Sequence, residues 1–407
     1  MDPELRARFN AGFTPELHER VCRDMARRHG IETFEFRLAE SPVFLSPEQR
    51  DACESAARGI VAEMSRKDVV ARGAERIPER FRVPSTDALP HMACVDMALA
   101  AGPSGKIVPR LIEAQGFPSL YGMQVLQGDV WSDALAGVPG MPAAGYSLYW
   151  GGLDRESYLS LLRKTVIGDA DPNEVVLLDI APEKQKTRPD FLATEKLLGV
   201  RAVCITTLVR EGRRLLAPLG RRLVPVRRIY NRVVFDELES KKIAAPFDWR
   251  EPLDVTWVPH PNWYWIWSKA SIPHLRHEAV PEARFLSEVG EWPRDLSRYV
   301  LKPLFSFAGR GVVVDVDRAA IERIPAAERH DWLLMEKVEY APALVTPDGA
   351  GVKVEIRALF LRPDGATALV PAVNLCRLSR AKMHGVDFNK DLPWTGSSVA
   401  LWRYKGV

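Results

Sequence analysis

One lysine and a glycine-rich loop in the last third of the chain form a combination that can bind phosphate. Lys302 lies in an apolar, strand-like run, and Ser306, Gly309 and Gly311 follow in a loop before a valine-rich run at 312–314. Glycines allow backbone N–H groups to close on an anion, and a lysine on the adjoining strand can neutralise phosphate oxygens. The segment therefore predicts a strand, a phosphate-covering loop and a second strand. Taken alone, SFAGRG also fits an ordinary hairpin that contains glycine.

The chain then continues into a segment that could bind a base. The apolar run at 333–335 predicts a short buried strand, and Glu336, Lys337 and Val338 extend it with backbone groups that could pair with an adenine edge. The two most familiar phosphate loops are absent, because the sequence contains neither GxxxxGK[ST] nor GxGxxG. These residues indicate a nucleotide site of another class.

Together these segments resemble the nucleotide site of the ATP-grasp superfamily, in which a strand lysine, a glycine loop and an apolar strand ending in a hinge bind ATP. LLMEKVEYAP resembles the hinge of eukaryotic-type glutathione synthetase. CRLSRAKMHG followed by TGSSVALW resembles that family's substrate-binding arginine, its ATP-contacting lysine and its last glycine-rich loop, which places Arg380 and Lys382 in the first two roles. WSKASIPHL resembles the segment with the first ATP lysine, which is Lys269 here.

A further segment, RLIEAQGFPSLYG, resembles the Glu-x-Asn strand that holds magnesium in the same family, with Glu113 and Gln115 in its two positions. The motifs occur in the order of the permuted glutathione synthetase and glutathionylspermidine synthetase arrangement, and they cover roughly Asp96 to the C-terminus. The resemblance implies that ATP and Mg²⁺ are the cofactors.

The expected metal site differs from the family pattern at two positions. Glu113 and Gln115 share a strand face, and Mg²⁺ prefers one or two carboxylates together with phosphate oxygens and water. Gln115 replaces an asparagine with a longer amide, and Ser306 stands where glutathione synthetase has a loop glutamate. Asp96, in the preceding VDMALA segment, resembles an aspartate that helps to bind metal in glutathionylspermidine synthetase. It could restore the second carboxylate, whereas the alternative for Glu113 is an exposed polar strand position.

Glu355 and Arg357 also share one strand face, in KVEIRALFL. They could form an internal ion pair with each other. Alternatively, Glu355 could contact the nucleotide or a lysine near the metal, and Arg357 could hold phosphate or a substrate carboxylate.

Three arginines are candidates for holding the substrate carboxylate and the negative charge that develops during reaction. Besides Arg380, they are Arg310 in the glycine loop and Arg232 at the end of the strand-like run RIYNRVV. A surface strand position is an equally good interpretation of Arg232. Asp387 and Asn389 either lie in a lid over the site or cap a loop.

Apolar periodicity predicts an α/β (α+β) fold that assembles the site from separate regions. Residues 1–85 have helical spacing, and residues 86–150 contain the metal-site strands and a connector rich in glycine and proline. Residues 151–250 alternate strand and helix, which predicts an open α/β layer. The resemblance implies that this layer is the substrate domain that precedes the nucleotide domain, and that residues 251–407 form the ATP-grasp nucleotide and lid region.

Composition favours an enzyme with a sizeable core. The chain has 407 residues, 46% of them hydrophobic, and a formal net charge of +3. This balance gives no general electrostatic footprint for nucleic acid, and the basic cluster at 221–228 is interpreted as a solvated hairpin rim. We expect small-molecule partners, an amino-acid or peptide substrate and an amine, and leave a homodimer open.

The sequence also favours the cytoplasm. It contains no long apolar run and no hydrophobic leader after MDPELRARF, so we expect no membrane partner. The five cysteines fit neither a disulfide framework nor a zinc site. They are Cys22, Cys53, Cys94, Cys204 and Cys376.

The resemblance implies an ADP-forming carboxylate–amine ligase in which ATP converts a carboxylate to an acylphosphate that an amine then attacks. Two alternatives remain open. A hydroxyl acceptor would make the chain a small-molecule kinase, and loss of the loop carboxylate at Ser306 could leave a nucleotide-binding protein without turnover.

Overall fold

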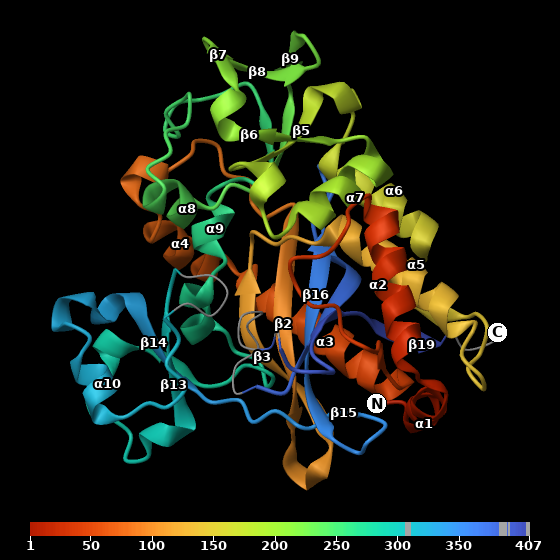
Figure 1. Cartoon of the computed structure of the whole chain (residues 1–407). Helices are drawn as coiled ribbons and strands as arrows, with labels where there is room; N and C mark the ends of the chain where they lie inside the picture. The colour runs from red at the N-terminus through yellow and green to blue at the C-terminus, as the bar shows by residue number, and fades with distance from the viewer. Residues whose placement is uncertain (306–310, 382–388, 390, 404–407) are drawn as a thin grey trace.

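The computed structural model of the chain describes residues 1–305, 311–381, 389 and 391–403. A sheet of antiparallel pairs occupies its centre (Figure 1), with strand order β18-β17-β16-β2-β3 and β15 paired to β16. Its strands are β2 (Met92–Ala101), β3 (Ile107–Gln115), β15 (Leu344–Val345), β16 (Gly351–Leu361), β17 (Val370–Ser379) and β18 (Gly396–Ser398). Strands β2 and β3, which contain Asp96 and Glu113, are antiparallel neighbours.

Four helices precede this sheet, as the spacing of residues 1–85 predicts. They are α1 (Pro3–Gly12), α2 (Pro15–His29), α3 (Pro47–Met64) and α4 (Lys67–Glu75). Three of them begin with proline directly after a capping side chain, namely Asp2, Thr14 or Ser46, which accepts a backbone N–H of the first turn. Helix α3 packs against β2, β3 and β17 and so covers the apolar face of the central sheet.

A parallel sheet lies above the central sheet in Figure 1 and contains the predicted open α/β layer. Its order is β11-β10-β5-β6, formed by β5 (Val175–Asp179), β6 (Arg201–Cys204), β10 (Arg228–Asn231) and β11 (Thr256–Val258). The accompanying helices are α5 (Tyr121–Leu135), α6 (Arg155–Val166), α7 (Arg188–Leu198) and α8 (Phe235–Ser240). The basic segment forms the predicted hairpin in a separate sheet of β7 (Val209–Glu211), β8 (Arg214–Leu219) and β9 (Arg222–Val226).

A third sheet carries the lysine of the expected phosphate site. It contains β12 (Ala283–Phe285), β13 (Tyr299–Pro303) and β14 (Trp332–Glu336) in the order β12-β14-β13, and it lies beside the central sheet (Figure 1). Together with α10 (Arg318–Glu322) it encloses a small second core that includes Leu301, Ile321 and Leu334. Strand β13 confirms the strand predicted before the glycine loop.

The second predicted strand, expected at 312–314, is reduced to one bridge. Leu301 and Val313 exchange two backbone hydrogen bonds of 2.9 Å. The next such pair along an antiparallel ladder would place Gly311 opposite Pro303, and proline has no N–H to donate. The ladder therefore does not continue towards the loop.

The remaining elements close the structure. Strands β1 (Val43–Phe44), β4 (Tyr146–Ser147) and β19 (Ala400–Arg403) form a small sheet, and α9 (Trp263–Ile266) leads into a 3₁₀ segment at Lys269–His274.

The whole is a mixed α+β fold, which confirms the predicted class; the domain boundaries stay predictions. All five cysteines are free thiols. Within the described residues, no helix has both the length and the apolar character needed to cross a bilayer.

Candidate nucleotide and metal site

A cluster of charged side chains lies on the face of the central sheet that α3 does not cover. Strand register places Asp96 of β2 opposite Glu113 of β3 on one side and opposite Arg357 of β16 on the other. Glu355 of β16 is in turn opposite Arg377 of β17. Since residues two apart share a strand face, four neighbouring strands present these charges together.

A bulge shapes this cluster at Glu113. Asp96 pairs with Glu113 but Met97 pairs with Leu111, so Ile112 is the extra residue on β3. The carbonyl oxygen of Ile112 accepts a hydrogen bond of 2.9 Å from Nζ of Lys302. The bulge thus supplies the hydrogen-bond acceptor for Lys302, which lies on the third sheet.

Asp96 is held by two arginines. Arg357 donates from Nε to Oδ1 at 2.6 Å and from Nη2 to Oδ2 at 2.7 Å, and Arg377 donates from Nη2 to Oδ2 at 2.6 Å. Burial opposes ionisation of Asp96, but the two guanidinium charges outweigh it and hold the pKa of Asp96 below its ordinary value. Asp96 is therefore an ionised anchor whose two oxygens already have partners.

Glu355 belongs to the same network. Arg377 donates to its Oε1, and Tyr340 donates to its Oε2 at 2.9 Å. The internal ion pair considered between Glu355 and Arg357 does not form; instead Glu355 pairs with Arg377 and Arg357 pairs with Asp96. The reason is that residues on one strand face are two positions apart, whereas cross-strand neighbours stand directly opposite.

Glu113 has a different set of partners, which suits it to a ligand-binding role. Its Oε1 lies 3.2 Å from Nζ of Lys269 and accepts a 2.7 Å hydrogen bond from Nε2 of Gln115. Burial opposes its ionisation, but the charge of Lys269 and the Gln115 hydrogen bond, together with Lys302, keep the pKa of Glu113 below its ordinary value. Sequence reasoning predicted that these two residues of β3 point into one site, and their side chains are in contact.

Lys269 reaches Glu113 because its segment packs closely against the end of β3. The N–H of Gly116 donates to the carbonyl of Trp267 at 2.9 Å. A Cβ on Gly116 would lie 2.8 Å from the carbonyl oxygen of Trp263, so only glycine permits this approach. A pocket opens at this junction. Its lining comprises Glu113, Gln115, Phe117, Tyr264, Trp267, Ser268, Lys269, Leu304 and Phe305.

Lys302 points towards the cluster because side chains alternate between the two faces of β13. Its neighbour Leu301 faces the second core, whereas Lys302 points the other way, is 8% exposed and reaches β3. Burial lowers the pKa of Lys302 to about 8, although Glu113 opposes the shift. The cluster therefore contains two buried lysines, from segments 33 positions apart in the sequence, beside one carboxylate.

Some predicted site residues lie outside the described residues. They are Ser306, Gly309, Arg310, Lys382 and Asp387. Gly311 has a φ of +75°, which suits the turn after the loop.

Part of the expected hinge is already hydrogen-bonded within the protein. The N–H groups of Glu336 and Lys337 donate to the carbonyls of Glu282 and Arg298 at 2.8 and 2.7 Å. The adenine contact that we predicted there would therefore depend on Val338 or on carbonyl groups.

Arg380 lies after β17 and is exposed, and its backbone N–H donates to Oδ1 of Asn389 at 3.3 Å. Asn389 Oδ1 also accepts from the hydroxyl of Ser379 and the N–H of Ala381. Of the two interpretations of Asn389, loop capping is the one that the structure contains.

Arg232 lies at the carboxyl end of the parallel sheet and is buried rather than on the surface. Its Nη1 donates to the carbonyl of Pro118 at 2.8 Å, and the guanidinium lies over the Phe117 ring, 5.1 Å from its centroid. Nearby Asp179 ends β5, and burial raises its pKa to about 7 against the opposing charge of Arg232. Ligands of open α/β sheets bind at such carboxyl ends.

Sequence reasoning missed two members of the cluster, Arg377 and Tyr340. The signal for Arg377 was present, since it is the one charged residue in the apolar strand VNLCRLS. Tyr340 follows β14 and carried no comparable signal, because only the folded chain brings it to Glu355.

The donor set allows magnesium only with help from a nucleotide. In the described part of the chain, no group of three or more His, Cys, Asp or Glu side chains is arranged to hold a metal ion. Glu113 and the amide oxygen of Gln115 nevertheless match the usual Mg²⁺ site, in which one or two carboxylates act together with phosphate oxygens and water. The residues present thus fit a nucleotide-bound metal better than a free one.

Comparison with known proteins supports the fold. The chain is similar to a solved structure described as a glutathione synthetase like-effector (GSS30) from Globodera pallida in its apo form, with a TM-score of 0.57 and 13% sequence identity. The similarity covers 90% of this chain and 95% of that one. No protein-family profile and no curated protein sequence matches the chain. The chain therefore has a fold like that of a glutathione synthetase-like structure.

Proposed function

We propose that the chain is an ATP-dependent, ADP-forming ligase that joins the carboxylate of an amino acid or small peptide to an amine. The observation that carries this proposal is the convergence of Lys269 and Lys302 on Glu113. The two lysines come from different elements and are 4% and 8% exposed. Asp96 and Glu355 are engaged by arginines, so Glu113 is the cluster's carboxylate that faces the two lysines, and burying both cations is costly unless further negative charge joins them. A triphosphate supplies such charge.

The nucleotide would lie between the third sheet and the central sheet. Lys302 and Lys269 would neutralise its phosphates, and Glu113 with Gln115 would hold Mg²⁺, which when bound adds positive charge at the transferring phosphoryl group. Glu355 would contribute through its contact with Arg377, and Asp96 through its hold on both arginines. The segment ending at Val338 would contact the adenine.

The chemistry needs no protein nucleophile. An oxygen of the substrate carboxylate attacks the γ-phosphorus, the bond to the β-phosphate oxygen breaks, and ADP leaves an acylphosphate. The amine nitrogen then attacks the acyl carbon, phosphate leaves with the bond to carbon broken, and the amine loses a proton to solvent. The protein's part is to position the reactants and stabilise negative charge.

Arginines would bind the substrate carboxylate. Arg377 suits this role because its side chain is 32% exposed while it remains anchored to Asp96 and Glu355. Arg232, beside Asp179 at the carboxyl end of the parallel sheet, would hold a second carboxylate or an amino-acid group of the same substrate. Arg380 and Arg310 stay predictions for the same charge.

The test is magnesium-dependent ADP release from ATP with pools of amino acids, dipeptides and amines. We expect ADP only when an acid and an amine are both present, and none from Lys302→Ala. Lys106→Ala is the matched control, because Lys106 is an exposed lysine on the turn before β3. ADP formed with an alcohol alone would instead indicate a kinase.

A second candidate is a nucleotide-binding protein without turnover. It is favoured by the two arginines that occupy both oxygens of Asp96, which leaves Glu113 as the cluster's carboxylate for metal among the described residues. ATP binding measured by calorimetry, with no ADP from any substrate mixture, would support this candidate over the ligase.

A further inference from the structure

The carboxyl end of the parallel sheet carries two buried side chains of opposite charge. Asp179 is the last residue of β5, and Arg232 directly follows β10. In this parallel pair Leu178 stands opposite Asn231, and the N–H of Arg232 donates to the carbonyl of Leu178 at 2.8 Å. Asp179 and Arg232 are therefore the next two residues to stand opposite each other, and they are 3% and 8% exposed.

Within the described part of the chain, these two charges form no ion pair with each other. Oδ1 of Asp179 accepts the N–H of Ile180 at 2.7 Å. Nη1 of Arg232 donates to the carbonyl of Pro118 at 2.8 Å, and its Nε is buried without a hydrogen-bond partner among the described residues. Charged side chains are rarely buried unless a partner of opposite charge accompanies them. The pair is therefore open to the charges of a ligand.

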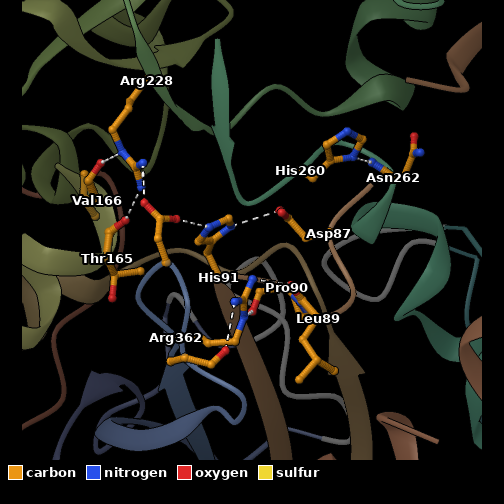
Figure 2. Close-up of polar contacts among 12 residues, drawn as sticks. Asp87, Leu89, Pro90, His91, Thr165, Val166, Arg228, His260, Asn262 and Arg362 are labelled. Atoms are coloured by element: carbon orange, nitrogen blue, oxygen red, sulfur yellow. Dashed lines mark hydrogen bonds and ion pairs between the residues drawn. The ribbon is translucent and has the colours of Figure 1, made fainter. Parts of the chain in front are cut away.

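Arg228, four residues earlier on the same strand, is a buried arginine whose contacts are complete. Figure 2 shows its guanidinium group between the end of α6 and the carboxylate of Asp364. Its Nε and Nη2 donate to the carbonyls of Val166 and Thr165, and its Nη1 donates to Oδ2 of Asp364 at 2.6 Å. Each nitrogen of this guanidinium has a partner, and one partner is a carboxylate. Arg232 has no such carboxylate among the described residues, so a ligand can supply it.

A second buried acid near Arg232 already has its own partners. Asp190, in α7, is fully buried and accepts the N–H groups of Leu120, Gly122 and Met123 at 2.9 Å each. These are backbone groups at the start of α5, so Asp190 caps that helix. It therefore does not take the place of a carboxylate bound to Arg232.

Topology and backbone conformation mark the same place. In the strand order β11-β10-β5-β6, the chain adds β6 on one side of β5 and later adds β10 on the other side. Ligands of open α/β sheets bind at the carboxyl ends of the strands where the order reverses in this way. Ala181, two residues after Asp179, has a φ of +42°, and left-handed residues other than glycine cluster at binding sites.

Phe117 connects this place to the candidate nucleotide pocket. Its ring lies against the guanidinium of Arg232, whose central carbon is 5.1 Å from the ring centroid. The same side chain lines the pocket that contains Glu113. A molecule with one end at Arg232 can therefore direct its other end past Phe117 towards the expected phosphates.

We propose that Asp179 and Arg232 form a receptor for the amino-acid end of the substrate, in which Asp179 binds the ammonium group and Arg232 the carboxylate. The inference rests on the proposed function for the reaction that follows, whereas binding itself requires no ATP. An ammonium and a carboxylate on one carbon carry the two charges that this unpaired acid and arginine would neutralise. The carboxylate that reacts with ATP is then a second one, at the other end of the molecule. Asp179 thus selects substrates with a free amino group.

The charged groups around Asp179 give this binding a pH dependence. Burial raises the pKa of Asp179 to about 7, with Arg232 and Lys241 opposing the shift and Glu237 adding to it. Glu237 is itself paired with Lys241. Because an ammonium group binds the ionised carboxylate, affinity should fall by up to about tenfold for each pH unit below 7. The substrate's own carboxylate ionises near about pH 3.5 and does not contribute in this range.

The test is calorimetric binding, without ATP or magnesium, of the twenty amino acids and their dipeptides with glycine. The tightest binder is then compared with its N-acetyl derivative and with its carboxamide. We expect either change to weaken binding to the native chain by about tenfold to hundredfold, the size of one lost charged hydrogen bond. Equal binding of the free and N-acetyl forms would overturn the proposal, as would the absence of binding by every compound in the set.

Variants assign each end of the ligand. Asp179→Asn should weaken binding of the free form, remove the discrimination against the N-acetyl form and flatten the pH dependence below 7. Arg232→Gln should remove only the discrimination against the carboxamide. Asp169→Asn is the control, because Asp169 is exposed in the turn that precedes β5, at the opposite end of that strand. Discrimination that persists unchanged in Asp179→Asn would refute the assignment. If Arg232→Gln does not fold, Asp179→Asn and the pH profile of the native chain decide.

Failure of this receptor and failure of the ligase have different signatures. Amino-acid binding that depends on Asp179, without ADP release from any mixture, would support the receptor and count against the ligase. ADP release that is equally fast with N-acetylated acid substrates would support the ligase and overturn the receptor.

Discussion

Asp96 and Glu113 stand directly opposite each other on β2 and β3, yet they have different partners. Asp96 is 1% exposed and bound by Arg357 and Arg377, whereas Glu113 contacts Lys269 and Gln115 at the edge of a pocket. The two carboxylates, although they share one face of one hairpin, therefore have different roles. Asp96 organises the arginines, and Glu113 faces the space in which a ligand would bind.

Replacing Asp96 should reveal its structural role. Asp96→Asn leaves the buried Arg357 without its carboxylate and Arg377 with Glu355 alone, and breaking a buried ion pair in this way costs about 3–5 kcal/mol. We expect a loss of this size in the free energy of unfolding, measured with urea. Asp133→Asn is the control, because Asp133 pairs with Arg28 while 69% exposed, and such surface pairs contribute at most about 1 kcal/mol. Equal, small losses in both variants would contradict the anchoring role.

Lys302→Met should stabilise the free protein while it weakens ATP binding. Because the folded-state pKa of Lys302 is lowered to about 8, the charged lysine destabilises the fold below that pH, and the cost fades as the pH rises towards the unfolded value of 10.5. The variant should gain up to about 3 kcal/mol at pH 7. Urea unfolding at pH 7 and 10 measures this gain, which should be smaller at pH 10. A loss of stability at pH 7 would show that the lysine is satisfied without an anion.

ATP binding should also take up protons near pH 8. The phosphates would favour the charged form of Lys302, whose pKa is about 8 in the free protein. Calorimetric titrations of the native chain in buffers of different ionisation enthalpy measure this uptake. It should be largest near pH 8 to 9 and absent in Lys302→Met. Uptake that persists in the variant would assign the proton to another group.

Asp179→Asn should remove a pH dependence of stability near neutrality. Burial raises the folded-state pKa of Asp179 to about 7, so the stability contributed by its protonated form is lost as the pH rises through 7. Native stability should fall as the pH rises from about 4, the ordinary value, to about 7 and should level off above it, below the range of the Lys302 effect. The variant should be flatter over that range and more stable at pH 8, by up to about 4 kcal/mol. An unchanged pH profile would contradict this assignment.

Arg377 and Arg380 can be separated by substitution. Arg377→Lys removes a guanidinium that links Asp96 and Glu355, so we expect about a tenfold to hundredfold fall in ligase kcat/KM, the size expected for one lost charged hydrogen bond. Arg380→Lys keeps the charge at an exposed position and should have a smaller effect. A larger fall in kcat/KM for Arg380→Lys than for Arg377→Lys would favour Arg380, which the sequence analysis had proposed.

Much of this organisation follows from sequence. The two-residue period puts Glu113 with Gln115 on one strand face, and helical spacing predicts the N-terminal helices. Buried apolar runs separated by helical segments predict the parallel sheet. These features depend on neighbours in the chain, so local patterns contain them.

Only the tertiary structure decided how the charges pair. The register of β16 against β2 and β17 gives Arg357 to Asp96 and Arg377 to Glu355, although the sequence places Glu355 and Arg357 together. A bulge of one residue at Ile112 provides the acceptor for Lys302, which is 190 positions away. The strand expected at 312–314 is one bridge, and the missing N–H of Pro303 ends its ladder on the side of the loop. Strand register and long-range contacts depend on the packing of the whole chain, and no local pattern encodes them.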